Sequence, residues 1–379
     1  MAEVVYRIAG PADREKYIDF ANMVFSCAHV PHDFKALIPK VYADGRDTDD
    51  MHNIAVRDDG SIRGLVAVMP NELTVAGTVL KTGYVGTVST HPYGRGEGHM
   101  KKLMDMAISR MQEDGVDMAM LGGQRQRYEY FGFTNGGVSR NHRVTATNLR
   151  HVLGDTCVDD ISIDEVSRED SAVLKKCAQL NDSRIVHAKR TVDEFHIIAN
   201  TWYKKLFAVN IGGEFAGYII GAGDSFAEIM LRDVSETLRV IKAYFKKTGE
   251  KNVSFSTGDF EVALNRELAK AEESMSMGHP EMLRIFDFVK VIGALMKLRA
   301  SCKPMQDGVR SFIIDDKPMT VRVDNGVPEV TAEAGEDALS LTAMEAQRLF
   351  LSMNGEELIA PLPLGWAPLP LFMSHADAF

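Results

Sequence analysis

The chain has 379 residues, of which 45% are hydrophobic and 25% are charged, and its formal net charge at pH 7 is -10. This length exceeds a single ordinary hydrophobic core and predicts two or three domains of a soluble globular protein. The acidic balance argues against a nucleic-acid partner, which would need a basic face, and is compatible with a cationic small molecule drawn toward an acidic cleft.

Metal, disulfide and membrane roles find no support in the sequence. No paired spacing links the four cysteines, which are Cys27, Cys157, Cys177 and Cys302, and the 11 histidines form no ligand cluster. The first residues are charged, and no later run is long and apolar enough to span a membrane. We therefore expect a cytoplasmic protein with reduced thiols, without a bound metal and without a membrane partner.

The beginning of the chain, as far as Leu80, alternates between strands and helices. A strand over Val4–Ile8 precedes a helix over Pro11–Ser26, whose apolar residues recur at helical spacing. A short helix follows near Phe34–Val41. Three further strands are predicted, over Ile54–Arg57, Leu65–Met69 and Leu73–Leu80.

A strand over Val85–Ser89 then runs into a glycine-rich turn, in which Gly94, Gly96 and Gly98 alternate with Arg95 and Glu97. A helix begins near His99, so the amides of the turn lack helical partners and point toward one spot beside the positive end of the helix dipole. The spacing matches neither the dinucleotide pattern Gly-x-Gly-x-x-Gly nor a Walker lysine. The turn therefore predicts a site for a phosphate of another kind of ligand, with an ordinary glycine-rich connection as the alternative.

The helix after the turn has a methionine-rich face that we assign to the core. Its apolar residues are Met100, Leu103, Met104, Ala107, Ile108 and Met111. A strand over Asp117–Leu121 follows, and Gly123 and Gln124 then lead into the aromatic segment Tyr128–Phe133.

From about Ser139 the order of elements starts again. Helices are predicted near Glu169–Leu180 and Val192–Leu206, a hairpin turns at Gly212-Gly213, and a strand over Ala227–Leu231 precedes a helix over Ser235–Lys247. The junction between that strand and that helix has no glycine and carries two carboxylates. We therefore expect a second copy of the first fold that cannot bind the phosphate ligand.

The last part begins after a connector over Ser274–Pro280. A helix over Phe288–Ala300 precedes three alternating strands, a helix over Leu341–Leu351 and a tail rich in proline, leucine and aromatic residues. The predicted domains are residues 1–138, 139–280 and 281–379.

Two of these stretches resemble motifs of the GNAT superfamily of acyl-CoA-dependent N-acetyltransferases. The glycine turn is similar to its pyrophosphate loop, and Tyr128–Phe133 is similar to its segment Tyr-x-x-Phe-Gly-Phe/Tyr. The whole chain resembles the Eis (enhanced intracellular survival) family. That resemblance implies an α+β protein with two acyl-CoA N-acyltransferase (GNAT) folds in tandem, followed by a sterol-carrier-protein-like α+β domain. It also implies acetyl-CoA as co-substrate, a primary amine of an aminoglycoside-like molecule or polyamine as acceptor, and a homo-oligomer, namely a hexamer.

The resemblance assigns the cofactor to three groups of residues. The pantetheine arm would lie along Gly86, Thr87, Val88 and Ser89. The diphosphate would be held by Gly94, Arg95, Gly96, Glu97, Gly98, His99 and Met100, and Gly123 and Gln124 would complete the site. Two departures from the family concern this loop, since it is poor in arginine and Glu97 introduces a carboxylate beside the expected diphosphate.

Acetyl transfer to an amine needs a base and an acid. A lysine-like amine with a pKa of about 10.4 is neutral in only about one molecule per thousand at pH 7, so a base must take its proton. By resemblance, Tyr128 is the general acid and the terminal carboxylate of Phe379 is the general base. The alternatives are that Tyr128 only packs among aromatic residues and that Phe379 is frayed; Glu129, His91 and Asp377 are weaker candidates for the base.

Two other functions remain open from the sequence. One is acylation of protein or peptide lysines, or transfer of a longer acyl chain as in N-myristoyltransferases, which also pair two such folds. The other is a lipid-binding or scaffold protein without catalysis, which the carrier-like third domain suggests.

Overall fold

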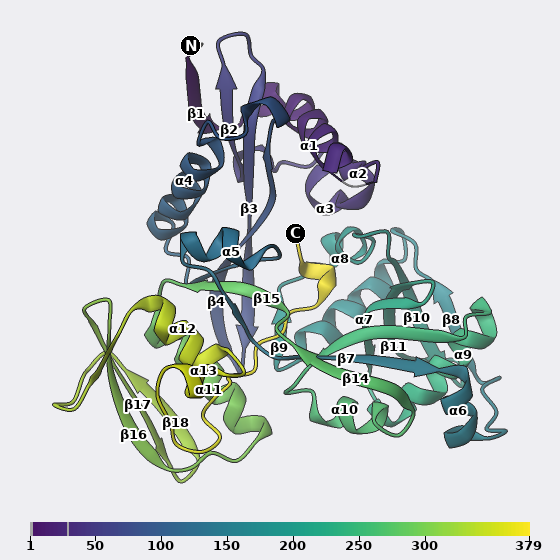
Figure 1. The fold of residues 1–379 in the computed structure, drawn as a ribbon. Coiled ribbons are helices and arrows are strands. Elements are labelled where there is room, and N and C mark those ends of the chain that lie inside the picture. Colours follow the sequence, from purple (N-terminus) through teal and green to yellow (C-terminus); the bar gives the residue numbers. More distant parts are fainter. Residues whose placement is uncertain (1–2, 29) are drawn as a thin grey trace.

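The computed structural model describes residues 3–28 and 30–379, and within them the strands form three β-sheets (Figure 1). The first sheet has the order β1-β2-β3-β4-β5-β15-β6, with β9 paired to β3. Its strands are β1 (Val4–Ile8), β2 (His52–Arg57), β3 (Ile62–Val75), β4 (Thr78–Thr90), β5 (Met118–Leu121), β6 (Thr134–Gly136), β9 (Val186–Ala188) and β15 (Glu281–Ile285).

Helices cover both faces of this sheet. One face packs against α1 (Arg14–Ala28), α2 (Phe34–Leu37) and α3 (Pro39–Tyr42), and the other packs against α4 (His99–Glu113) and α5 (Arg125–Tyr128). The apolar face predicted for the helix after the glycine turn is buried, with Leu103, Met104 and Ala107 fully inaccessible. The methionine stripe is therefore core.

The strands β3 and β4 form one long hairpin, so the prediction of a separate strand over Leu73–Leu80 was wrong. Ala76 and Gly77 have φ of 46° and 81°, and Val75 pairs with Thr78 across them. A two-residue turn with positive φ at both positions matches the twist of an antiparallel pair. The apolar residues on either side concealed this turn in the sequence.

The second sheet repeats the order of the first, as β14-β7-β13-β12-β11-β10-β8. Its strands are β7 (Ser139–Thr145), β8 (Ile161–Glu165), β10 (Lys205–Ile211), β11 (Glu214–Ala222), β12 (Ser225–Leu231), β13 (Asn252–Gly258) and β14 (Glu272–Gly278). As in the first sheet, one parallel pair, β12 and β13, is joined through a helix, α9 (Thr237–Thr248). The other helices of this part are α6 (Ala146–Leu153), α7 (Ser171–Asp182), α8 (Val192–Ala199) and α10 (Val262–Leu268).

The two sheets exchange strands. After β6 the chain leaves the first sheet, and β7 lies between β13 and β14 of the second; after β14 it returns, and β15 lies between β5 and β6 of the first. The stretch Ser274–Pro280, expected as a connector, is thus mostly the strand β14. The strand β15, which begins at the predicted boundary of 281, is a strand of the first sheet. Figure 1 shows both crossing strands between the two parts.

The third sheet, β18-β17-β16-β19, packs with helices of the last part of the chain. Its elements are α11 (Phe288–Cys302), β16 (Gly308–Ile314), β17 (Lys317–Asp324), β18 (Val327–Thr331), β19 (Leu339–Leu341), α12 (Ala343–Leu351) and α13 (Gly355–Leu358). One hydrophobic core joins it to the first sheet, because α11 packs on both. From α13 the tail turns back and ends between the first and second sheets (Figure 1). Among the described helices, none has the length and apolarity needed to cross a membrane.

Candidate active site

A cavity of about 970 Å³ opens where β4 and β5 end. Its wall contains every residue that the sequence assigned to the cofactor or to catalysis except Glu97. These are Gly86, Thr87, Val88, Ser89, Gly94, Arg95, Gly96, Gly98, His99, Met100, Gly123, Gln124, Tyr128 and Phe379. The fold therefore brings the last residue of the chain to the same place as the glycine turn and the tyrosine segment.

The strands β4 and β5 separate at the cavity. Their parallel pairing ends with Tyr84 and Met120, although β4 continues to Thr90. A β-bulge on β4, opposite the step from Leu65 to Ala67 on β3, bends the strand there. The edge of β4 beyond Tyr84 is thus left unpaired on this side, and an extended ligand can add to such an edge as a strand.

Thr87 is the strained residue of this bulge, with φ of 51° in the left-handed region. Its hydroxyl lies 2.6 Å from the hydroxyl of Tyr42, which in turn is 3.3 Å from Nε2 of His52. His52 Nδ1 is 2.9 Å from the carbonyl oxygen of Thr48. Burial lowers the pKa of His52 to about 4, so this ring is neutral. The hydrogen bonds that support the bulge therefore involve no charged group.

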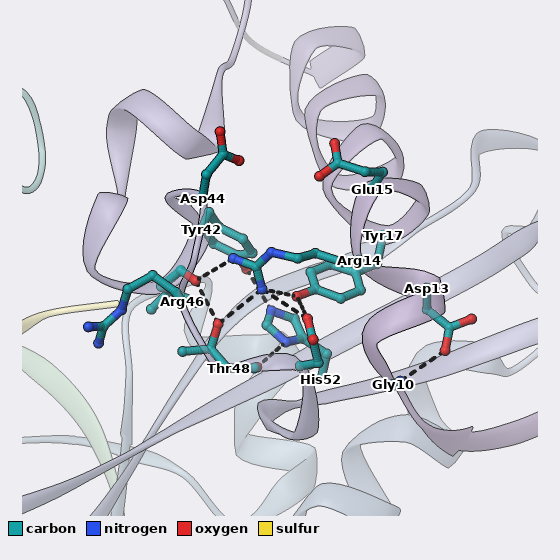
Figure 2. Close-up of polar contacts among 12 residues, drawn as sticks. Gly10, Asp13, Arg14, Glu15, Tyr17, Tyr42, Asp44, Arg46, Thr48 and His52 are labelled. Atoms are coloured by element: carbon teal, nitrogen blue, oxygen red, sulfur yellow. Dashed lines mark hydrogen bonds and ion pairs between the residues drawn. The ribbon is translucent and has the colours of Figure 1, made fainter.

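Arg14 ties α1 to this network (Figure 2). Its guanidinium donates to Asp49 Oδ1 at 2.9 Å and to the carbonyl of Ala43 at 2.9 Å, and the Tyr17 hydroxyl donates to Asp49 at 2.6 Å. The ion pair is largely buried, so it is screened little by solvent. These bonds fix α3, and with it the side chains that α3 directs toward the end of the chain.

The glycine turn presents free amides to the cavity. Gly96 and Gly98 have φ of 87° and 81°, and Gly98 caps α4. In the described chain the amides of Gly96, Gly98, His99 and Met100 donate to no protein acceptor. An αL glycine followed by a helix N-terminus gathers such donors around an anion, which fits a diphosphate.

Glu97 departs from its expected position, because it does not line the cavity. Its carboxylate is 2.8 Å from Nε2 of His99 and 3.9 Å from Arg57, and the hydrogen bond from His99 lowers the pKa of Glu97. The negative charge of Glu97, which we expected beside the diphosphate, is therefore paired with His99 and Arg57. Arg63, which the sequence did not single out, lies under Gly94, where a Cβ would be 3.2 Å from its guanidinium.

Tyr128 is buried, and its ring packs directly on Gly123. A Cβ at Gly123 would lie 2.4 Å from the Tyr128 ring, so only glycine fits there. Burial raises the pKa of Tyr128, which keeps its phenol protonated. Gln347 of α12 donates to the carbonyl of Gly132 at 3.0 Å, and Arg284 donates to that of Phe131 at 2.6 Å. The strand β15 and the helix α12 thus hold the tyrosine segment in place.

The end of the chain is buried rather than frayed. The Phe379 ring covers Gly86, where a Cβ would be 2.7 Å from it. Lys40 of α3 donates to the carbonyls of Ala376 at 2.8 Å and Ala378 at 2.6 Å, and Trp202 donates to the latter at 3.3 Å. Burial lowers the pKa of Lys40 to about 7.

A buried ion cluster holds the tail from the second sheet. Arg190 bonds both carboxylate oxygens of Asp377, at 2.9 and 2.8 Å, and both of Glu228 on β12, at 2.6 and 3.1 Å. Asp377 therefore has a structural partner, which weakens it as a candidate base. Sequence reasoning missed Lys40 and Arg190, because nothing near either residue in the chain marks its partners in the distant tail.

One side of the cavity is apolar. Its wall near α1 and α2 consists of Val24, Phe25, Ala28, Phe34, Ile38 and Trp202. No Asp or Glu side chain occurs in the described lining, whereas Arg95 and Arg127 do. The acidic cleft that the net charge suggested is thus not found in this cavity. Across the described residues, no group of three or more potential metal-binding side chains was found.

A family profile and several solved structures resemble this chain. The profile of the Acetyltransferase (GNAT) domain matches residues 5–136. No curated protein matches the chain. A GCN5-related N-acetyltransferase from Kribbella flavida has a TM-score of 0.68 at 14% identity, covering 100% of this chain and 99% of that one.

Two further solved structures share the fold over nearly the whole length. A probable N-acyltransferase from Enterococcus faecalis V583 has a TM-score of 0.66 at 16% identity, covering 92% of this chain and 90% of its own. Eis1 from Mycobacterium abscessus has a TM-score of 0.63 at 12% identity, with 100% of both chains covered. The chain therefore carries a GNAT acetyltransferase domain over residues 5–136, and the protein is an acyltransferase.

Proposed function

We propose that the protein transfers an acetyl group from acetyl-CoA to a primary amine of a small molecule by direct attack. The observation that carries the proposal is the single cavity in which the open edge of β4, the glycine turn, Tyr128 and Phe379 meet. A strand edge suits the amide groups of pantetheine, and free amides suit the diphosphate. The donor supplies an activated thioester.

The chain's own residues supply the acid and base of this proposal. Tyr128 keeps its proton at neutral pH and gives it to the departing sulfur. The α-carboxylate of Phe379 is the general base, since an apolar setting raises the pKa of a carboxylate toward a useful range. The ring of Phe379 on Gly86 supports this role, because it keeps the last residue beside the edge of β4.

The apolar wall of the cavity favours one class of acceptor amine. A polycation would meet two arginines and no carboxylate side chain in the described lining of this cavity. An amine attached to an apolar or aromatic body fits that wall better than the aminoglycoside-like or polyamine acceptor expected from resemblance. We propose such an amine as the acceptor class and keep the polycations as rivals.

We also infer an Eis-type arrangement of three parts. The repeated strand order supports a second GNAT-like fold. Between its strand β12 and its helix α9 the chain has Asp233 and Glu236 where the first fold has glycines. The third sheet with α11 and α12 corresponds to the proposed sterol-carrier-protein-like domain. The hexamer is tested by light scattering on the purified protein, where a monomer would contradict it.

The decisive experiment measures donor binding and CoA release. Calorimetry should detect acetyl-CoA binding, and a thiol-release assay over arylalkylamines, polyamines, aminoglycosides and lysine peptides should show turnover with the apolar amines first. Absence of both binding and release would reject the enzyme. Faster release with lysine peptides or with long-chain acyl-CoA would favour the protein-acylation or long-chain alternative.

The role of Phe379 has its own test. Removing Phe379 or adding two residues after it should lower kcat by roughly 10²-fold or more, because a general base contributes 10² to 10⁴. Acetyl-CoA binding should change little in the extended variant. Unchanged kcat in both variants would reject the α-carboxylate as base.

A further inference from the structure

Glu281 occupies an unusual place in the first sheet. On β15 it pairs with Gly136 of β6, and the pairing of Met282 with Leu121 sets it level with Gly122 at the end of β5. Gly122 is in turn level with Gly86, because Tyr84 pairs with Met120 two residues earlier. Among the four residues level with one another on β6, β15, β5 and β4, Glu281 is thus the one that is not glycine, on the face where the Phe379 ring covers Gly86.

The Glu281 carboxylate lies beside Gly122, which lines the donor cavity. A Cβ at Gly122 would lie 3.5 Å from Oε2 of Glu281 and 3.9 Å from the hydroxyl of Tyr84, while Gly122 itself lines the cavity. Oε2 of Glu281 is buried and has no hydrogen-bond partner among the described residues. A buried carboxylate oxygen without a partner is costly, so its presence at this point calls for a functional reason.

The other side of Glu281 faces a second cavity, of about 610 Å³, between the first and second sheets. Trp202 lines both cavities, and Glu281 is the only carboxylate side chain in the described lining of the second. The remaining titratable groups there are His142 of β7, His279 before β15, His375 of the tail and Lys204 before β10. Glu281 therefore stands between the donor cavity and a space open to solvent.

Two protons must leave the acceptor nitrogen, because an ammonium group with three becomes an amide with one. An ordinary carboxylate is too weak a base for the first of them, and a base works best with a pKa near the working pH. Burial raises the pKa of Glu281 to about 7, and the nearby hydroxyl of Tyr84 opposes this shift. A single α-carboxylate on Phe379 would otherwise have to serve both transfers.

We propose that Glu281 is a second catalytic carboxylate, which receives the acceptor's ammonium group at the junction of the two cavities and takes its first proton. This role rests on the acetyl transfer proposed above. An N–H bond breaks and the proton passes to Glu281, which later releases it to solvent through the second cavity. The nitrogen lone pair forms the C–N bond with the thioester carbon as the C–S bond breaks.

The remaining transfers balance. Tyr128 protonates the sulfur, and the second proton of the nitrogen passes to the α-carboxylate of Phe379 and restores Tyr128. The sum converts an ammonium ion and acetyl-CoA into an acetamide, CoA and one free proton. Glu281 accounts for that free proton.

The test compares Glu281→Gln with Glu273→Gln, which changes an exposed carboxylate on β14, the strand that precedes β15 in the sequence. Glu281→Gln should lower kcat by roughly 10² to 10⁴-fold, the usual contribution of a general base, and remove the rise of kcat through about pH 7. Acetyl-CoA affinity and melting temperature should not fall, because the amide is isosteric and removes a buried charge. Glu273→Gln should behave as wild type throughout.

A second variant does not depend on losing the carboxylate. Tyr84→Phe removes the hydroxyl that favours the ionised form of Glu281, so the rise of kcat should move to higher pH. A purely structural glutamate would leave that rise unmoved in both variants, and wild-type kcat in Glu281→Gln would overturn the proposal. If the wild-type protein binds no acetyl-CoA and acetylates no amine, the proposed acetyl transfer itself is rejected, and the role of Glu281 in it is rejected as well.

Discussion

At the scale of single residues, the site depends on groups whose ionisation is set by burial. Tyr128 is kept neutral by burial, and its ring position is fixed because Gly123 leaves room for it. Burial lowers the pKa of Lys40 to about 7, and the amine donates to two carbonyls of the tail. Each of these groups can be removed by an isosteric or near-isosteric change.

Replacing Tyr128 with Phe should lower kcat by roughly 10² to 10⁴-fold, because the sulfur then leaves without a proton donor. The KM for acetyl-CoA should change little, since the ring remains. Steady-state thiol release measures both constants. Tyr130→Phe is the matched control, because Tyr130 lies in the same segment but is 65% exposed and outside the cavity. Equal kcat in Tyr128→Phe and wild type would remove Tyr128 from the mechanism.

Replacing Lys40 with Met should loosen the tail. The change leaves the carbonyls of Ala376 and Ala378 with fewer donors in a buried setting, at about 1–3 kcal/mol for each group left unpaired. We expect faster hydrogen exchange at the tail and kcat lower by roughly tenfold or more. Lys35→Met, at a partly exposed position of α2, is the control, and tail exchange equal to wild type in Lys40→Met would contradict the clamp.

Lys40 also predicts how stability depends on pH. Burial lowers its folded pKa to about 7, below the unfolded value of about 10.4. Between these values the unfolded chain binds the extra proton, so the free energy of unfolding of wild type should rise with pH relative to Lys40→Met. Denaturant titrations at pH 7 and pH 10 measure this difference. A difference that is constant or shrinks with pH would refute the assigned ionisation.

At the scale of elements, the cavity arises from the separation of two parallel strands and from the turn that follows one of them. The bulge at Thr87 bends β4 away from β5, and the network of Tyr42 and His52 supports it. The turn then uses two glycines with positive φ to gather amides before α4. Neither device needs a charged side chain, which agrees with the scarcity of arginine in the loop.

Replacing Gly98 with Ala should weaken acetyl-CoA binding by roughly tenfold or more. The left-handed conformation costs an alanine about 1–2 kcal/mol, and relief of that strain turns the amides away. Gly115→Ala is a close control, because Gly115 has φ of 67° at the other end of α4 and, like Gly98, has open space at its Cβ. Calorimetry should show weaker binding only for Gly98→Ala. Equal loss in both variants would mean that the effect is general destabilisation.

The glycine turn and the helix α4 were predicted from the sequence because their signals are local. A glycine turn between an apolar strand and an amphipathic helix is visible within one short window of sequence, and so is the segment around Tyr128. The hairpin of β3 and β4 was misread for a related reason, since Ala76-Gly77 is a weak turn signal inside a long apolar run. The strand β14 was missed because it is an exposed edge, on which the alternating methionines are not buried.

At the scale of the whole molecule, no part stands alone. The first sheet contains β9 and β15 from later in the chain, the second contains β7 from just after β6, and the tail ends between them. A cut at residue 138 would remove β15 from between β5 and β6 of the first sheet, along with the tail that covers Gly86.

Residues 1–138 expressed alone should therefore fail to fold, because β5 and β6 lose the strand between them. Co-expression with residues 139–379 should restore a stable, active complex, since the strands can still pair between two chains. Circular dichroism and acetyl-CoA binding measure both states. A stable fragment 1–138 that binds acetyl-CoA would show that the exchanged strands are dispensable.

Neighbouring residues were enough to reveal the glycine turn and the buried face of α4, whereas the roles expected of Tyr128 and Phe379 came from resemblance to a family. Backbone propensity and apolar spacing act over a few residues, so such features are readable without the fold. The exchange of β7 and β15, the clamp of Lys40 and Arg190 on the tail, and the position of Glu281 beside Gly122 emerged only from the folded chain. Each depends on strand register or on contacts between segments far apart in the sequence, and burial, which sets their charges, exists only once those distant segments have packed together.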